Sequence, residues 1–142
     1  MAEMHWRVFF EAAPSGGGAT YLDWTLHGLK LTVLLSLASW CIALTWGSVM
    51  GVLRTVPSRI LYGIATVYVE VFRNVPLLVQ LFIWYFVVPG LVPTALGDWF
   101  KQRDPLVQQF VAATACLGFF TGARICEQVR AGIESLSRGQ NE

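Results

Sequence analysis

The sequence predicts an all-α integral membrane protein. Of its 142 residues, 55% are hydrophobic and only 13% are charged, and the mean hydropathy is +0.55. So few charges cannot cover a water-soluble globule of this size. Three apolar segments take up most of the length, which leaves no room beside them for a soluble domain of ordinary size. We therefore expect any catalytic domain to lie on another polypeptide.

Charge and cysteine content exclude several other classes. A formal net charge of +1 and a pI near 7.7 give no basic field for nucleic acid, so nucleic acid is not expected as a partner. Cys41, Cys116 and Cys126 form neither a CxxC motif nor a Cys/His cluster, and His5 and His27 make no ligand spacing with them. The cysteines are interpreted as small buried apolar groups, and no metal site is predicted.

The first segment, residues 1–30, is expected to lie outside the membrane or at its surface. A Pro-Ser-Gly-Gly-Gly breaker at 14–18 precedes aromatic and polar residues from Tyr21 to Lys30, which suit a short helix at the level of the lipid headgroups. The segment lacks the basic start, short apolar core and cleavage site of a secretory signal, so we expect it to remain on the mature protein.

The first membrane span is predicted at residues 31–53. This run carries no charge and is long enough for a hydrocarbon core of roughly 30 Å. Ser39, Ala43, Gly47 and Gly51 recur at every fourth position, which allows another helix to approach closely. We expect this stripe to pack within a helical bundle.

The second span is predicted at residues 60–88, after a loop at 54–59 whose two arginines favour the cytoplasmic side. It contains Pro76, which cannot donate to the Phe72 carbonyl and whose ring crowds that oxygen. We therefore predict one long, tilted helix that kinks at Pro76 and leaves the Phe72 carbonyl open.

Polar residues in the second span are the candidates for a substrate path. Glu70, Arg73 and Gln80 share one face at helical spacing, and Asn74 is adjacent. Ionisable residues at membrane depth usually mark a pathway, and an arginine fork suits a carboxylate. In the alternative interpretation, which stays open, Glu70 and Arg73 form an i, i+3 ion pair that only neutralises both charges where the helix enters the membrane.

The rest of the chain is predicted to form a loop on the far side at 89–104, a third span at 106–123 and a cytoplasmic amphipathic helix within 124–142. Asp104 and Pro105 form a helix start. The last segment has an apolar stripe, and on its opposite side successive i, i+3 and i, i+4 pairs of opposite charge are formed by Glu127, Arg130, Glu134 and Arg138. A slight excess of basic residues at the predicted cytoplasmic positions favours an N-terminus outside the cell and a cytoplasmic C-terminus.

Three stretches of this sequence resemble a known family. They are YVEVFRNVPLLVQLFIWYFVVP at 68–89, LDWTLHGLKLTVLLS at 22–36 and ARICEQVRAGIESLSRGQNE at 123–142. They resemble the membrane-spanning permease subunits of bacterial ABC importers for polar amino acids. The amino-acid sequences of residues 68–96 and 116–140 are most similar to those of glutamate/aspartate importer permeases.

The resemblance implies a fold and a set of partners. The fold is the N-terminal three-transmembrane-helix portion of an ABC importer type I permease domain, in the bacterial inner membrane. In that family two permease subunits form a pore, a periplasmic amino-acid-binding protein delivers the substrate, and an ATPase dimer uses ATP. The chain has no GxxxxGK[ST] phosphate loop, which agrees with ATP use on a partner chain and with a transport subunit that is not itself an enzyme. The residues implied in coupling to the ATPase are Glu127, Arg130, Glu134, Gly139, Gln140 and Glu142.

Alternatives to the permease hypothesis remain open from the sequence. The family's ATPase-docking loop continues past the glutamate that matches Glu142, so we expect a C-terminally truncated fragment. A small non-transporting assembly protein or an inactive permease remnant would carry the same features. An intramembrane enzyme or channel is disfavoured, because no histidine lies in any predicted span and no repeated acidic rings occur. The transported amino acid and the composition of the pore, homodimer or heterodimer, stay open.

Overall fold

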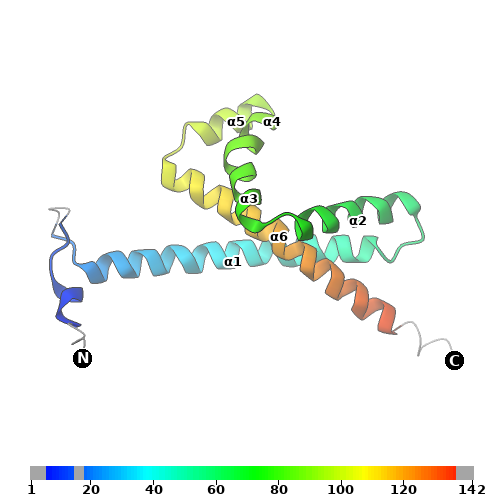
Figure 1. The fold of residues 1–142 in the computed structure, drawn as a ribbon, viewed down its shortest axis with the longest axis horizontal. Helices are drawn as coiled ribbons and strands as arrows, with labels where there is room; N and C mark the ends of the chain where they lie inside the picture. The colour runs from blue at the N-terminus through cyan, green and yellow to red at the C-terminus, as the bar shows by residue number, and fades with distance from the viewer. Residues whose placement is uncertain (1–5, 15–17, 137–142) are drawn as a thin grey trace. The chain divides into compact units, whose positions relative to one another are not determined.

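The computed structural model describes residues 6–14 and 18–136. Regular structure in these residues is helical (Figure 1), apart from an isolated antiparallel bridge between Ala12 and Thr20. The all-α fold class is therefore confirmed for the described part of the chain. The chain divides into two compact units, residues 1–35 and 36–142, which are described separately.

The first unit contains a short 3-10 helix η1 (Trp6–Phe10) and the beginning of α1 (Tyr21–Leu53). The Thr20 N–H donates to Asp23 Oδ2 at 2.9 Å, and the Asp23 N–H donates to Thr20 Oγ1 at 3.3 Å. This reciprocal cap starts the helix at Tyr21. The predicted boundary near residue 31 is therefore wrong as a helix boundary, because the expected interfacial helix and the first span form one continuous helix.

In the second unit, the later part of α1 packs against α6 (Pro105–Leu136) through small residues. The buried residues of α1 are Ser39, Ala43, Gly47, Met50 and Gly51, and they include the whole predicted stripe. A Cβ added at Gly47 would lie 2.6 Å from the Gly122 carbonyl oxygen, and one added at Gly51 would lie 2.7 Å from Val129 Cβ. The two backbones approach so closely that no side chain fits between them at these glycines.

Helix α2 (Arg59–Asn74) packs on another part of α6. Ala65 and Val69 of α2 are buried in a core that also contains Ala123 and Cys126 of α6. Near the start of α2, the Tyr62 ring lies 5.6 Å from the Arg130 guanidinium carbon of α6, and farther along α2 the Tyr68 hydroxyl donates to the Phe119 carbonyl of α6 at 2.6 Å. Later residues of α2 thus meet earlier residues of α6, so the two helices run in opposite directions.

The second predicted span is broken rather than kinked. After α2 come α3 (Leu77–Phe82), a π-helix η2 (Ile83–Val87) and α4 (Val88–Leu91), and the helical axis turns by 108° across the break. Val75 is extended, with φ −88° and ψ 128°, and Pro76 has φ −55° and ψ 140°. A residue before proline avoids the helical region, so α2 ends where the sequence places Pro76. The prediction of a single continuous helix over 60–88 is wrong.

The two other segment boundaries also differ from prediction. Residues 89–104 contain α5 (Thr94–Lys101) where a loop was expected, with Pro93 immediately before its first turn. Helix α6 passes through residues 123 and 124 without a break, so the third span and the amphipathic segment share one helix. Two helices, α1 and α6, are long and apolar enough to cross a membrane, and the bent pair 59–74 and 77–91 is a third span only if it counts as one. Three spans therefore remain a prediction.

The three cysteines are free thiols. Cys116 and Cys126 of α6 are buried, as the sequence predicted, but Cys41 of α1 is exposed. An apolar helix that faces lipid on one side places some of its small apolar residues on that outer side, so membership in an apolar segment did not determine burial.

Candidate functional site

Gln80 closes the break at Pro76. Its side chain is only 5% exposed, and its Nε2 donates to the Phe72 carbonyl at 2.9 Å and to the Val75 carbonyl at 2.8 Å. The Phe72 carbonyl is the acceptor that Pro76 was predicted to leave open. In an amide the nitrogen carries both N–H donors and the oxygen only accepts, so the two carbonyl acceptors determine the orientation of the Gln80 amide. Gln80 thus supports the helix end, and its place in a substrate path stays a prediction.

The other residues proposed for the substrate path are exposed at the end of α2. Glu70, Arg73 and Asn74 all lie on its outer surface. Among the ion pairs of residues 6–14 and 18–136, Arg73 pairs with Glu127 of α6, with Nη1 3.7 Å from Oε1, and none joins Arg73 to Glu70. Arg73 therefore pairs with Glu127 of α6, and the alternative of an ion pair between Glu70 and Arg73 is wrong.

Glu127 is shared between two arginines of very different burial. The Arg54 Nη1 donates to Glu127 Oε1, the same oxygen that Arg73 approaches. The Arg54 side chain is 7% exposed, whereas that of Arg73 is 57% exposed. Burial alone would lower the pKa of Arg54, but the hydrogen bond and the charge of Glu127 outweigh it, so the pKa of Arg54 is raised. Arg54 is thus firmly held, and Arg73 is only loosely held.

Arg54 was missed as a site residue because the sequence placed it in a cytoplasmic turn. A signal was present in the sequence. Arg54 follows Gly51 by three positions, so it continues the small-residue stripe of α1. A residue on that face meets whatever helix the stripe packs against, and here that helix is α6, which carries Glu127.

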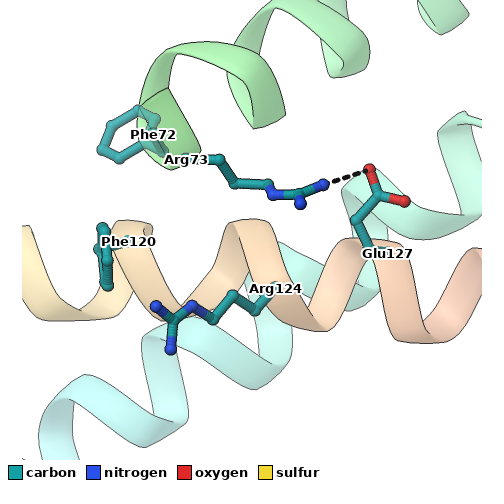
Figure 2. A pocket seen from close by; sticks show the side chains of 5 residues that line it. All are labelled: Phe72, Arg73, Phe120, Arg124 and Glu127. Atoms are coloured by element: carbon teal, nitrogen blue, oxygen red, sulfur yellow. Dashed lines mark ion pairs between the residues drawn. The ribbon is translucent and has the colours of Figure 1, made fainter. Parts of the chain in front are cut away.

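A pocket of about 490 Å³ lies between the end of α2 and the middle of α6. This volume is within the roughly 300–1,000 Å³ that is usual for small-molecule sites. Figure 2 shows its five lining residues, with Arg73 reaching from α2 toward Glu127 and with Arg124 extending along α6 toward Phe120. They are Phe72, Arg73, Phe120, Arg124 and Glu127.

The chemistry of this pocket is cationic with aromatic walls. The Arg124 guanidinium carbon lies 4.9 Å from the centre of the Phe120 ring, in a cation–π contact. Two guanidinium groups and one carboxylate therefore border the same space. Guanidinium groups present paired N–H donors that match carboxylates and phosphates, so the pocket suits an anionic ligand.

The predicted coupling residues are only partly described. Arg130 Nε donates to Glu134 Oε1 at 2.7 Å farther along α6, at an exposed i, i+4 position. Glu127 does not pair with Arg130 as the charge pattern suggested, because the buried guanidinium of Arg54 takes it instead. Gly139, Gln140 and Glu142 lie outside the described residues.

Known proteins similar to this chain are transport components. The glutamate/aspartate import permease protein GltJ of Escherichia coli (strain K12) is 52% identical over 139 residues, which is 97% of this chain and 56% of GltJ. The glutamate/aspartate import permease protein GltK of Escherichia coli O6:H1 is 34% identical over 84% of this chain and 52% of GltK. The probable glutamine ABC transporter permease protein GlnM of Bacillus subtilis (strain 168) is 34% identical over 86% of this chain and 49% of GlnM.

These matches cover most of this chain but only part of each relative. The chain spans about half the length of the curated relatives it matches. No solved structure is significantly similar to it. Residues 43–142 match the family described as the inner membrane component of binding-protein-dependent transport systems, and these residues include α2 to α6 and the whole candidate pocket. The chain therefore belongs to the family of inner membrane components of binding-protein-dependent transport systems.

Proposed function

We propose that this chain is part of a permease subunit of an ATP-driven amino acid importer, with glutamate and aspartate as its substrates. Membership in the family supports the transport role, and the names of the relatives GltJ and GltK support the substrate class. A small non-transporting membrane protein receives no support from these comparisons. The subunit itself is not an enzyme.

The loosely held arginine of the pocket is the observation that carries this proposal. Arg73 lies in the last turn of α2, its side chain is more than half exposed, and it lines the 490 Å³ pocket. Its contact with Glu127 is 3.7 Å long, and an exposed ion pair of this kind contributes about 0–1 kcal/mol. An incoming carboxylate can therefore replace Glu127 on Arg73 at little cost, while Arg54 keeps Glu127 paired.

The partners that we propose follow from the family of the chain. ATP binds to a separate ATPase dimer, a second permease subunit completes the pore, and a periplasmic binding protein delivers the amino acid. The N-terminus lies in the periplasm and the C-terminus in the cytoplasm. We keep Arg130 and Glu134, with Gly139, Gln140 and Glu142, as the surface that contacts the ATPase. Glu127 lies at the start of this surface and links it to α1 and α2 through its two arginines.

The test is uptake by the complete importer that contains this subunit. Arg73→Ala should reduce glutamate uptake about tenfold or more, because a hydrogen bond to a charged group contributes about 1.5–3 kcal/mol. The amount of subunit in the membrane should change much less. Arg73→Lys should retain part of the uptake, and Arg103→Ala, an arginine outside the pocket, should have no effect. Equal loss of uptake and of membrane insertion would show that Arg73 is structural.

A further inference from the structure

We propose that Arg124 binds the second carboxylate of an acidic amino acid and thereby makes this pocket prefer acidic over neutral amino acids. This inference rests on the proposed transport function, and it concerns a residue that neither the sequence patterns nor the relatives' names single out. It starts from the groups that border the pocket.

The pocket and an acidic amino acid are complementary charge for charge. Arg73, Arg124 and Glu127 border the pocket as two cations and one anion. Glutamate and aspartate each carry two carboxylates and one ammonium group at neutral pH. Each ligand carboxylate therefore meets an arginine, and the ammonium group lies near Glu127, a carboxylate that also pairs with Arg54. A neutral amino acid has a single carboxylate and leaves one arginine without a partner.

Arg124 is available for this role. The ion pairs found within residues 6–14 and 18–136 engage Arg54, Arg73 and Arg130, and none of them engages Arg124. Its guanidinium lies over the Phe120 ring at 4.9 Å. A cation–π contact places the charge over the ring without a conventional hydrogen-bond acceptor, so the five N–H donors of the guanidinium remain available for a carboxylate. The ring thus holds the group in position without pairing its N–H donors with an oxygen acceptor.

The aromatic walls increase the discrimination. Phe72 and Phe120 border the pocket beside the two arginines. Apolar walls lower the local dielectric constant, which strengthens a paired charge and penalises an unpaired one. A site built to hydrogen-bond a polar group strongly rejects an analogue that lacks it, because the site's own polar groups then remain unpaired. Glutamine, which has the size of glutamate but a single carboxylate, is the appropriate competitor.

The experiment measures ligand binding to the purified complex of permease and ATPase subunits, without the binding protein, so that the receptor's own selectivity does not enter. Radiolabelled glutamate is bound and then displaced with unlabelled glutamate or glutamine. The variants are Arg124→Gln, Arg124→Lys and the matched control Arg103→Gln. Arg103 also lies 4.9 Å from an aromatic ring, that of Trp99, but it does not border the pocket.

In the unmodified complex, glutamine should compete at least about tenfold more weakly than glutamate, as expected for one missing charged hydrogen bond. Arg124→Gln should weaken glutamate binding about tenfold and leave glutamine binding within about twofold, so that the preference disappears. Arg124→Lys should keep part of the preference for glutamate, because an ammonium group retains the positive charge but lacks the paired N–H donors of the guanidinium. Arg103→Gln should behave as the unmodified complex does.

The contrary results are distinct. If Arg124→Gln weakens glutamate and glutamine binding equally, or keeps the preference unchanged, Arg124 does not recognise the second carboxylate. If the unmodified complex binds and transports no amino acid, the proposed function itself fails. Chemical restoration of the positive charge distinguishes loss of the charge from misfolding. In a Cys41→Ser background, Arg124→Cys treated with a positively charged aminoethyl thiosulfonate should regain the preference, and treatment with the neutral methyl reagent should not. Equal recovery with both reagents would overturn the proposal.

Discussion

Replacement of Gln80 by methionine tests whether its amide supports the break at Pro76. Methionine has nearly the same length and fills the same space, but it has no N–H donor. The carbonyls of Phe72 and Val75, now 2.9 and 2.8 Å from Gln80 Nε2, would each lose that partner. Because Pro76 has no N–H, no backbone donor of the next turn can replace the amide at the Phe72 carbonyl.

The size of the effect follows from these two hydrogen bonds. Hydrogen bonds made by polar side chains in membrane proteins contribute about 0.6 kcal/mol each on average, and at most about 1.7 kcal/mol. Two of them predict a loss of roughly 1–3 kcal/mol for Gln80→Met. Part of this loss is offset, since Gln80 Oε1 is buried without a hydrogen-bond partner and the substitution removes that atom. Gln80→Glu should be more harmful, because an ionised carboxylate would face two carbonyl oxygens and offer no donor.

The assay is thermal unfolding of the purified complex of permease and ATPase subunits, together with hydrogen exchange at the end of α2. The expected order of stability is unmodified protein, then Gln80→Met, then Gln80→Glu, with faster exchange near Asn74 in both variants. Gln109→Met is the matched control, because Gln109 is exposed on α6. If Gln80→Glu were as stable as Gln80→Met, the argument that two acceptors surround this amide would be refuted.

Two further predictions concern the packing of α1 on α6. Gly51→Ala should destabilise the subunit by about 1–3 kcal/mol through overpacking, since its new Cβ would lie 2.7 Å from a side chain of α6. Gly63→Ala is the control in the same thermal unfolding assay. Because Gly63 has open space around it, this substitution should be neutral or slightly stabilising. Glu127→Gln should cost about 1–3 kcal/mol, because it leaves the buried guanidinium at the end of α1 without a carboxylate, and Glu134→Gln in an exposed pair should change stability by less than about 1 kcal/mol. Equal effects of the two glutamate substitutions would contradict the difference in burial.

Local rules predicted the features of this chain that depend on neighbouring residues. The uncharged run before Arg54 predicted a helix, and the spacing of Ser39 and Gly47 predicted a face for close packing. The missing donor of Pro76 predicted an open carbonyl at Phe72. Each of these inferences needs only the residues of one continuous stretch of the chain.

The pairings of charges could not be predicted in this way. Glu127 has an oppositely charged neighbour three positions later, so the sequence allowed Arg130 to pair with Glu127 or with Glu134. An exposed pair of that kind contributes only a few tenths of a kcal/mol, whereas leaving the Arg54 guanidinium buried and unpaired costs far more. The need to pair the buried Arg54 guanidinium therefore determines which arginine Glu127 contacts. It depends on α1 meeting α6, which the sequence pattern does not specify.

The break in the second predicted span links stability to the proposed function. A continuous helix would place Arg73 in mid-helix, with the following turns packed along α6 beside it. Because the axis turns by 108° after Asn74, α2 ends there, and Arg73 lies in a last turn next to an open pocket. Pro76 produces that end, and Gln80 satisfies the carbonyls that the end exposes. Gln80→Met should therefore weaken glutamate uptake indirectly, by loosening the turn that carries Arg73, and should leave the ratio of glutamate to glutamine binding unchanged. Arg124→Gln should change that ratio while leaving the thermal stability nearly intact, so the two substitutions separate support of the helix end from recognition of the ligand.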